Sequence, residues 1–320
     1  MKTKINSHPP APIGLVVAAF AAVYLIWGST YLAIKFAVES IPPFLMAGTR
    51  NVVPGLLLLA LARARGAAWP SRLEWRDATI AGALMLALGN GGVTWAEKII
   101  PSGVTALLLA LTPAWMVLFD WLRPKGSRPG ALVISGLVVG FAGVTILARN
   151  NGHGAGPTYG WGVPVLMASS IGWSLGSIFN RNAHRPASPF LAVAMQMMAG
   201  GVVLLGVAAS AGEFQKFSFV QVTWISWGAW LYLVVAGSII AYTAYVWLLQ
   251  ASTPARVSTN SYVNPLIAVL LGCTVGHEAF SRDVFMAGAL IIAAVVLVLR
   301  GGGASRAQPA TDADACEEIA

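Results

Sequence analysis

Few side chains inside the long apolar stretches of this chain could do chemistry, and those few recur at helical spacing. Trp27 and Tyr31 are four residues apart, as are Asn260 and Asn264. This spacing puts both members of each pair on one face of a helix. Aromatic rings beside a few amides and hydroxyls are the usual lining of a pocket for a small organic solute. The pattern therefore indicates binding of a small molecule.

Similar residues on other apolar stretches favour one central site. Polar stripes that face lipid are disfavoured, so we expect these faces to look inward. The predicted lining is Trp27, Tyr31, Arg50, Asn90, Thr112, Trp173, Tyr242, Asn260 and Asn264. The alternative is that the polar groups only bond neighbouring helices, which is the better interpretation for any single serine or threonine.

Ionisable residues inside the apolar stretches are scarce. Arg50 lies about two turns into the second stretch, where it either pairs with a solute carboxylate or extends to the outer surface along its own methylenes. Glu97 and Glu278 lie near the outer ends of their stretches, and we expect both to be solvated. The predicted site therefore suits neutral or zwitterionic solutes that carry apolar groups.

Two prolines hold matching places in the chain. Pro113 lies near the middle of the stretch 101–122, and Pro265 holds the equivalent place 152 residues later. A proline inside a helix lacks the N–H that would bond the carbonyl four residues earlier, here Leu109 and Ser261. In hydrocarbon such a break is tolerated where protein or a water-filled cavity covers it. We therefore expect both prolines to break or gate their helices beside the predicted site.

Other chemistries find no support in the sequence. It contains neither a G-x-x-x-x-G-K-[ST] phosphate-binding loop nor an H-E-x-x-H zinc motif. The four histidines are scattered without metal-ligand spacing. We expect no catalytic centre, metal or cofactor. The formal charge of +8 does not indicate nucleic acid, because the basic residues lie in short connections between apolar stretches.

The composition identifies lipid as the solvent of these stretches. Of the 320 residues, 57% are hydrophobic and 10% are charged, and the mean hydropathy is +0.72. Soluble domains carry about 25% charged residues. The sequence therefore predicts an all-α integral membrane protein. Ten stretches are long enough to cross a bilayer, at roughly 13–34, 43–62, 78–96, 101–122, 130–148, 159–180, 189–210, 226–249, 254–276 and 284–300.

The offset of 152 divides the chain into two copies of five helices. Because five is odd, the copies enter the membrane from opposite sides as inverted repeats, which suits alternating access. Fourteen Lys and Arg residues lie at the termini and in the even-numbered connections, against five on the other side, so both termini are predicted to be cytoplasmic. The predicted divisions are a disordered lead at 1–12, repeats at 13–148 and 159–300, and a disordered tail at 301–320.

Three groups of residues resemble a known family. They are Trp27-Gly28-Ser29-Thr30-Tyr31, then Pro101-Ser102-Gly103 with Thr112-Pro113-Ala114-Trp115, and last Asn264-Pro265 with Gly276-His277-Glu278. In this order they resemble the EamA-type ten-span exporters of the drug/metabolite transporter superfamily. The family often has Gly-Glu at the last place, where His277 intervenes here. The resemblance implies a basket of ten helices around a substrate cavity.

Sequence and resemblance together predict a secondary transporter of the cytoplasmic (inner) membrane that exports small metabolites by alternating access. The expected solutes are amino acids, related neutral or zwitterionic compounds, and drugs. The expected partners are this substrate and the lipid bilayer, and the sequence leaves a homodimer open. Two other classes also stay open: an intramembrane enzyme, which requires a catalytic pair at membrane depth, and a passive channel, whose flux does not saturate.

Overall fold

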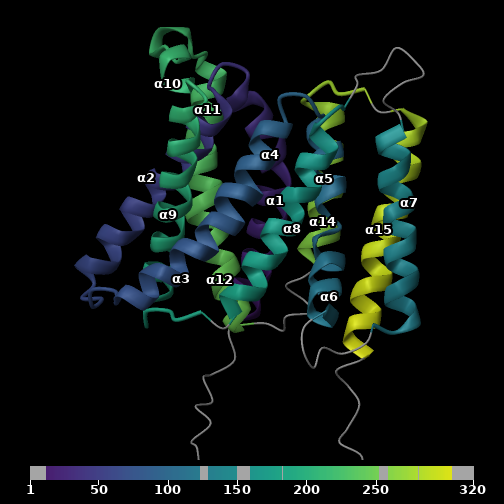
Figure 1. Cartoon of the computed structure of the whole chain (residues 1–320), viewed down its shortest axis with the longest axis horizontal. Helices are drawn as coiled ribbons and strands as arrows, with labels where there is room; N and C mark the ends of the chain where they lie inside the picture. The colour runs from purple at the N-terminus through teal and green to yellow at the C-terminus, as the bar shows by residue number, and fades with distance from the viewer. Residues whose placement is uncertain are drawn as a thin grey trace, which may run out of the picture.

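The computed structural model describes residues 12–122, 129–149, 159–181, 183–251, 259–279 and 281–304, and every regular element in these ranges is helical (Figure 1). The first half contains α1 (Ile13–Val38), α2 (Pro43–Ala64), α3 (Arg72–Gly82), η1 (Ala83–Asn90), α4 (Gly91–Ala96), α5 (Ser102–Leu109), α6 (Thr112–Leu122) and α7 (Ala131–Arg149). The second half contains α8 (Gly162–Arg181), α9 (Pro189–Ser210), α10 (Glu213–Lys216), η2 (Phe219–Gln221), α11 (Trp224–Tyr232), η3 (Leu233–Ala241), α12 (Tyr242–Ala251), α14 (Asn260–Thr274) and α15 (Arg282–Ala304). The predicted lead and tail lie outside the described residues, apart from Pro12 and residues 301–304, which continue α15.

Ten apolar helical segments in the described ranges correspond to the ten predicted stretches. Eight are long and apolar enough to cross a membrane, and two shorter ones cover Ala131–Ile146 and Val263–Thr274. The third span is the continuous helix α3–η1–α4, and the eighth is α11–η3–α12. The prediction of an all-α membrane protein with ten helices is confirmed.

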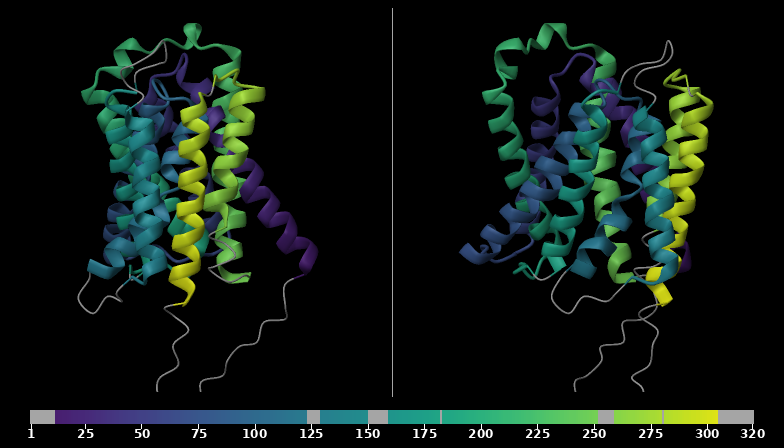
Figure 2. Two further views of the ribbon diagram at one scale, coloured as in Figure 1. Left: turned by 90° about the vertical axis from the view of Figure 1, so that its right-hand side faces the viewer. Right: turned by 45° about the vertical axis from the view of Figure 1, so that its right-hand side comes forward.

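The directions of the helices show the inverted relation between the two halves. We name the end of the bundle where α1 begins and α15 ends the terminal face (Figure 2). The other end, which carries α10 and the start of α11, is named the distal face (Figure 1). Successive spans alternate between these faces, so α8 opens the second half in the direction opposite to α1.

Helix packing follows the same symmetry. The second span of each half packs on its repeat partner, α2 on α9, and so does the fifth, α7 on α15. In the first half α1 packs against α14 and the η3 span, and in the second half α8 packs against α6 and the η1 span. Small residues allow the close approaches: a Cβ at Gly136 on α7 would lie 2.9 Å from the Ala294 carbonyl on α15.

Two repeat-related spans contain a π-helical segment, η1 in the third and η3 in the eighth. A π-helical segment bonds i to i+5 and widens the helix locally, and such segments occur frequently at functional sites. Asn90 is the last residue of η1, and Tyr242 follows the last residue of η3. Two predicted site residues therefore lie at matching ends of the two segments.

Candidate functional site

Trp27 of α1 lies directly against η3. Its indole Nε1 donates to the Gly237 carbonyl at 3.2 Å. Its ring centroid is 4.9 Å from that of Tyr245 and 6.3 Å from that of Tyr242, both on α12. The contact fixes the orientation of the indole, because a buried indole N–H needs an acceptor and here receives one from the backbone.

Trp173 of α8 packs against η1, as Trp27 of α1 packs against η3. A Cβ added at Gly89 would lie 3.2 Å from the Trp173 ring, tighter than an ordinary contact, so the glycine favours this close approach. Trp173 and Tyr242 pack on the same cluster of buried side chains, which includes Met85 and Leu86 of η1. The two tryptophans thus come from different halves of the chain. Tyr242 links them, because its ring contacts Trp27 and it packs on the same cluster as Trp173.

Arg50 of α2 lies beside these residues and is buried. It is 7% exposed, and its Nη1 lies 3.5 Å from Asn90 Oδ1, which also accepts from the Thr94 hydroxyl at 3.4 Å. A Cβ at Gly237 would lie 3.7 Å from Arg50 Nη2. Arg50 therefore does not extend to the outer surface. Its guanidinium lies between Asn90 and Gly237, the residue of η3 whose carbonyl accepts from Trp27.

The fourth span breaks just before Pro113. α5 ends at Leu109 and α6 begins at Thr112, so Pro113 is the second residue of α6, where its missing N–H costs nothing. The Thr112 hydroxyl donates to the freed Leu109 carbonyl at 2.6 Å and lies 3.0 Å from Ser170 Oγ. Ser174 Oγ donates to the Thr112 carbonyl at 3.1 Å. These bonds fix the break against α8, the helix that carries Trp173.

The predicted break at Pro265 is not seen, because α14 runs through it from Asn260 to Thr274. The proline lies in the second turn, where it removes only the bond to the Ser261 carbonyl. Asn264 beside it is 8% exposed, and its Oδ1 has no hydrogen-bond partner in the part of the chain that the structure describes. Its backbone carbonyl lies 3.3 Å from a Cβ built at Gly28 on α1, the residue after Trp27. Asn264 thus brings an unpaired acceptor to the Trp27 side of the bundle.

The remaining predicted residues are less closely connected. Tyr31 packs against the main hydrophobic cluster of the bundle. Asn260 begins α14, and its Oδ1 accepts from Ser261 Oγ at 3.3 Å. Between described residues, no hydrogen bond joins either side chain to Trp27, Arg50 or Asn90. The sequence did not predict Gly237 and Gly89, the glycines that contact Trp27 and Trp173, because nothing in it indicates the π-helical segments that contain them.

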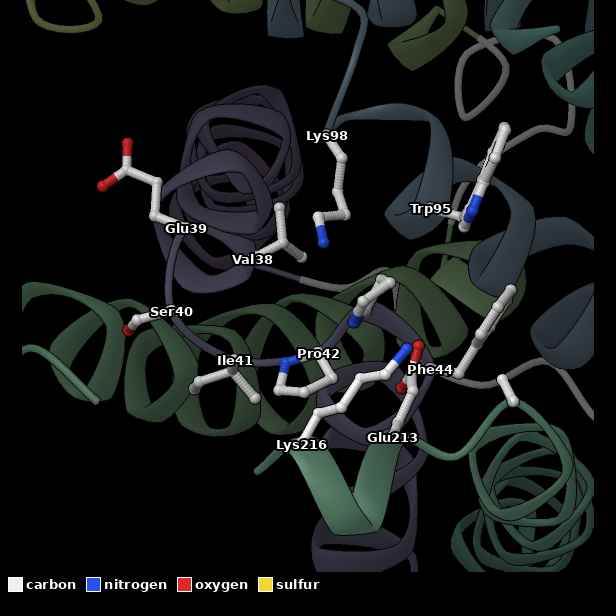
Figure 3. Close-up of a pocket in the computed structure, with 12 residues that line it drawn as sticks. Val38, Glu39, Ser40, Ile41, Pro42, Phe44, Trp95, Lys98, Glu213 and Lys216 are labelled. Atoms are coloured by element: carbon white, nitrogen blue, oxygen red, sulfur yellow. The ribbon is translucent and has the colours of Figure 1, made fainter. Parts of the chain in front are cut away.

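A separate pocket of about 390 Å³ opens at the distal face (Figure 3). Lys98 and Lys216 line it together with Glu39, Glu213 and the Trp95 ring. Glu213 accepts the Leu45 N–H at 2.8 Å and so caps the start of α2. Burial raises the pKa of Glu213 above its ordinary value, although backbone N–H groups oppose the shift. None of the predicted site residues lines this pocket.

Comparison with known families decides the class of the protein. A family model described as the EamA-like transporter family matches residues 13–149 and 160–300. The chain belongs to this family. Both halves match separately, which agrees with the two repeats α1 to α7 and α8 to α15. The EamA-like assignment also agrees with the motifs around Trp27, Pro113 and Pro265.

Relatives of the EamA-like chain are named as membrane transporters. It is 38% identical to the inner membrane transporter YedA of Escherichia coli strain K12, over 88% of this chain and 90% of that protein. It is 26% identical to the transporter YvbV of Bacillus subtilis strain 168, over 87% and 89% of the two chains. A solved crystal structure, 22% identical, covers 90% of this chain and 99% of its own with a TM-score of 0.60, and shares the fold. The chain is therefore a multi-pass inner membrane protein of a transporter family.

Proposed function

We propose that this EamA-like protein is a secondary transporter that exports small neutral or zwitterionic metabolites, amino acids among them, by alternating access. The observation that carries the proposal is the contact of Trp27 with η3 and of Trp173 with η1. Each tryptophan belongs to one repeat and its π-helical partner to the other. Because the repeats are inverted, exchanging their conformations presents equivalent aromatic surfaces to opposite faces of the membrane.

The groups around these contacts suggest the class of solute. The rings of Trp27, Trp173 and Tyr242 offer apolar walls. The buried Arg50 guanidinium suits a carboxylate, which it can bind with two parallel hydrogen bonds. The unpaired Oδ1 of Asn264 accepts an N–H from an ammonium or amide group. A zwitterion with an apolar side group would satisfy all of these groups.

The two alternative classes make different demands. An intramembrane enzyme requires a catalytic pair at the site, whereas the titratable side chains beside Trp27 and Asn90 are the Arg50 guanidinium and the phenols of Tyr242 and Tyr245, which are poor proton donors or acceptors at neutral pH. A passive channel requires a continuous path that needs no change of conformation. The two tryptophan contacts, each between one repeat and a π-helical segment of the other, favour a carrier, because alternating access works by exchanging the conformations of two inverted halves.

An uptake screen tests the proposal. The purified protein is reconstituted into proteoliposomes, and labelled amino acids and small drugs are offered with and without a pH gradient. We expect saturable uptake of at least one neutral or zwitterionic compound. Uptake that rises linearly with concentration favours the channel, and conversion of the compound into a product favours the enzyme.

The terminal face is proposed to be cytoplasmic, since most Lys and Arg residues lie at the termini and in the connections on that face. Reporter fusions after Ala68 and after Arg306 are expected to read cytoplasmic, and one after Gly154 to read external. An external signal after Ala68 would reverse the assignment, and with it the direction of export.

A further inference from the structure

Glu97, which follows the last residue of α4, is a buried carboxylate with no close hydrogen-bond partner among the described residues. The residue is 3% exposed, and no donor lies within 3.5 Å of either carboxylate oxygen, although the Lys35 backbone N–H acts on it weakly. This overturns the expectation that it is solvated. An ionised carboxylate in apolar surroundings is costly unless donors or a cation compensate it. The lack of close hydrogen-bond donors around Glu97 therefore favours its uncharged, protonated form.

The charged and titratable groups around Glu97 come from three other segments. Tyr31 and Lys35 act on it from α1, Arg50 from α2, and Glu278 from the connection after α14. The α8 helix also packs along α4, but it carries no titratable side chain between Gly162 and Asn180.

The neighbouring charges are engaged elsewhere. Lys35 Nζ lies 2.6 Å from Glu278 Oε1, and the same carboxylate accepts the backbone N–H groups of Ser102 and Gly103. Arg50 lies against Asn90, and no ion pair within 4.0 Å joins it to Glu97. Of the two carboxylates in this group, Glu97 is the one with no donor within 3.5 Å among the described residues.

The enclosure of Glu97 limits what it can bind. Each of its two oxygens exposes less than 1 Å² to solvent. A hydrated cation or a substrate ammonium group needs space and several oxygen ligands, whereas a proton needs neither. The remaining ligand that fits is a proton.

We propose that Glu97 is the proton-binding site of this transporter, protonated in the conformation seen here. The inference rests on the proposed carrier function. When the halves exchange conformations and bring Arg50 or Lys35 against Glu97, the carboxylic acid releases its proton to water and remains as the carboxylate of an ion pair. One proton then crosses for each cycle, and because Glu97 lies near the distal face the proton enters from that side while the solute leaves.

Infrared spectroscopy of the protein in lipid tests whether Glu97 holds a proton, without any substrate. A buried carboxylic acid gives a carbonyl stretching band distinct from that of a carboxylate. At neutral pH we expect this band in the unmodified protein and in Glu39→Gln, whose side chain is exposed at the end of α1. The band should be lost in Glu97→Gln. A spectrum of Glu97→Gln that matches the unmodified protein would overturn the proposal.

Coupling is tested with the solute that the uptake screen identifies. Glu97→Gln should keep exchange of labelled for unlabelled solute but lose accumulation driven by a pH gradient, whereas Glu97→Asp should keep both with a shifted pH dependence. Retained pH-driven accumulation in Glu97→Gln overturns the proton site. A response to a sodium gradient in place of the pH gradient also overturns it. Loss of exchange in the unmodified protein instead contradicts the carrier function.

Discussion

Glu278 Oε1 lies 2.6 Å from Lys35 Nζ at the distal face, and it also accepts the Ser102 N–H at 2.8 Å. His277 has a φ of 50°, in the left-handed region, and reverses the chain so that the Glu278 N–H meets the Gly272 carbonyl at 2.9 Å. The carboxylate therefore turns back into the bundle. It joins α1, the start of α5 and the end of α14 at one point.

Removing Lys35 should destabilise the protein. Its side chain is 28% exposed and that of Glu278 is 2% exposed, so Lys35→Met leaves a buried carboxylate without its cation. We expect a loss between the roughly 1 kcal/mol of an exposed pair and the roughly 3–5 kcal/mol of a buried one. Thermal unfolding in detergent measures it, with the exposed Lys98→Met as the control. Equal unfolding temperatures for the two variants would contradict this role.

Two glycines of α9 provide a matched test of helix packing. A Cβ at Gly200 would lie 2.7 Å from the Gly82 carbonyl on α3, whereas a Cβ at Gly206 meets nothing within 4 Å. We expect Gly200→Ala to lower stability by about 1–3 kcal/mol through overpacking. Gly206→Ala should leave stability unchanged or raise it slightly, since alanine favours the helix. The comparison uses thermal unfolding, and a Gly200→Ala variant as stable as Gly206→Ala would show that the two spans do not meet here.

Replacing Trp27 by phenylalanine isolates its hydrogen bond to Gly237. An aromatic ring still faces Tyr245, which Trp27 meets at a tilt of 43°, so we expect the protein to insert and fold. The lost hydrogen bond lowers stability by about 0.5–1.5 kcal/mol, and a ring without its fixed orientation should raise the half-saturation concentration of uptake. Concentration-dependent uptake measures the change, with Trp161→Phe as the control, because Trp161 is 77% exposed. If both variants have the same half-saturation concentration, Trp27 is not part of the solute-binding site.

Arg50 should discriminate between solutes by their charge. If its guanidinium holds a carboxylate, Arg50→Lys weakens transport of zwitterionic and acidic solutes, since lysine lacks the planar fork. A hydrogen bond to a charged group is worth about 1.5–3 kcal/mol, so a roughly ten- to hundredfold loss is expected for them. Neutral solutes without a carboxylate should be affected less. Unchanged competition by zwitterions in Arg50→Gln, at equal protein level, would assign Arg50 a purely structural role beside Asn90.

The helices and their symmetry could be predicted because a bilayer imposes them on the sequence. Its hydrocarbon thickness requires about 20 apolar residues per span. The stretch expected at 189–210 is α9, with the same bounds. Pro113 and Pro265 revealed the repeat because a proline acts on the backbone wherever it occurs. The sequence could not show that the helix breaks before Pro113 but continues through Pro265, because this depends on where the neighbouring helical turns begin.

The parts of the candidate site that depend on tertiary contacts were not predictable. No residue type in η1 or η3 specifies i to i+5 bonding, so the segments that meet Trp27 and Trp173 left no signal. Glu278 was expected to be solvated, which is wrong, because the start of α5 supplies N–H groups that its position in the sequence does not reveal. The unpaired Oδ1 of Asn264 likewise becomes apparent only once α14 is packed on α1.

Counterflow in proteoliposomes tests the central claim most directly, namely that one site between the repeats faces each side in turn. Vesicles loaded with unlabelled solute are diluted into a trace of labelled solute. We predict that label accumulates transiently above equilibrium in the unmodified protein and in Trp161→Phe, and that Trp27→Ala and Trp173→Ala abolish this overshoot. Equilibration without an overshoot in the unmodified protein would contradict alternating access.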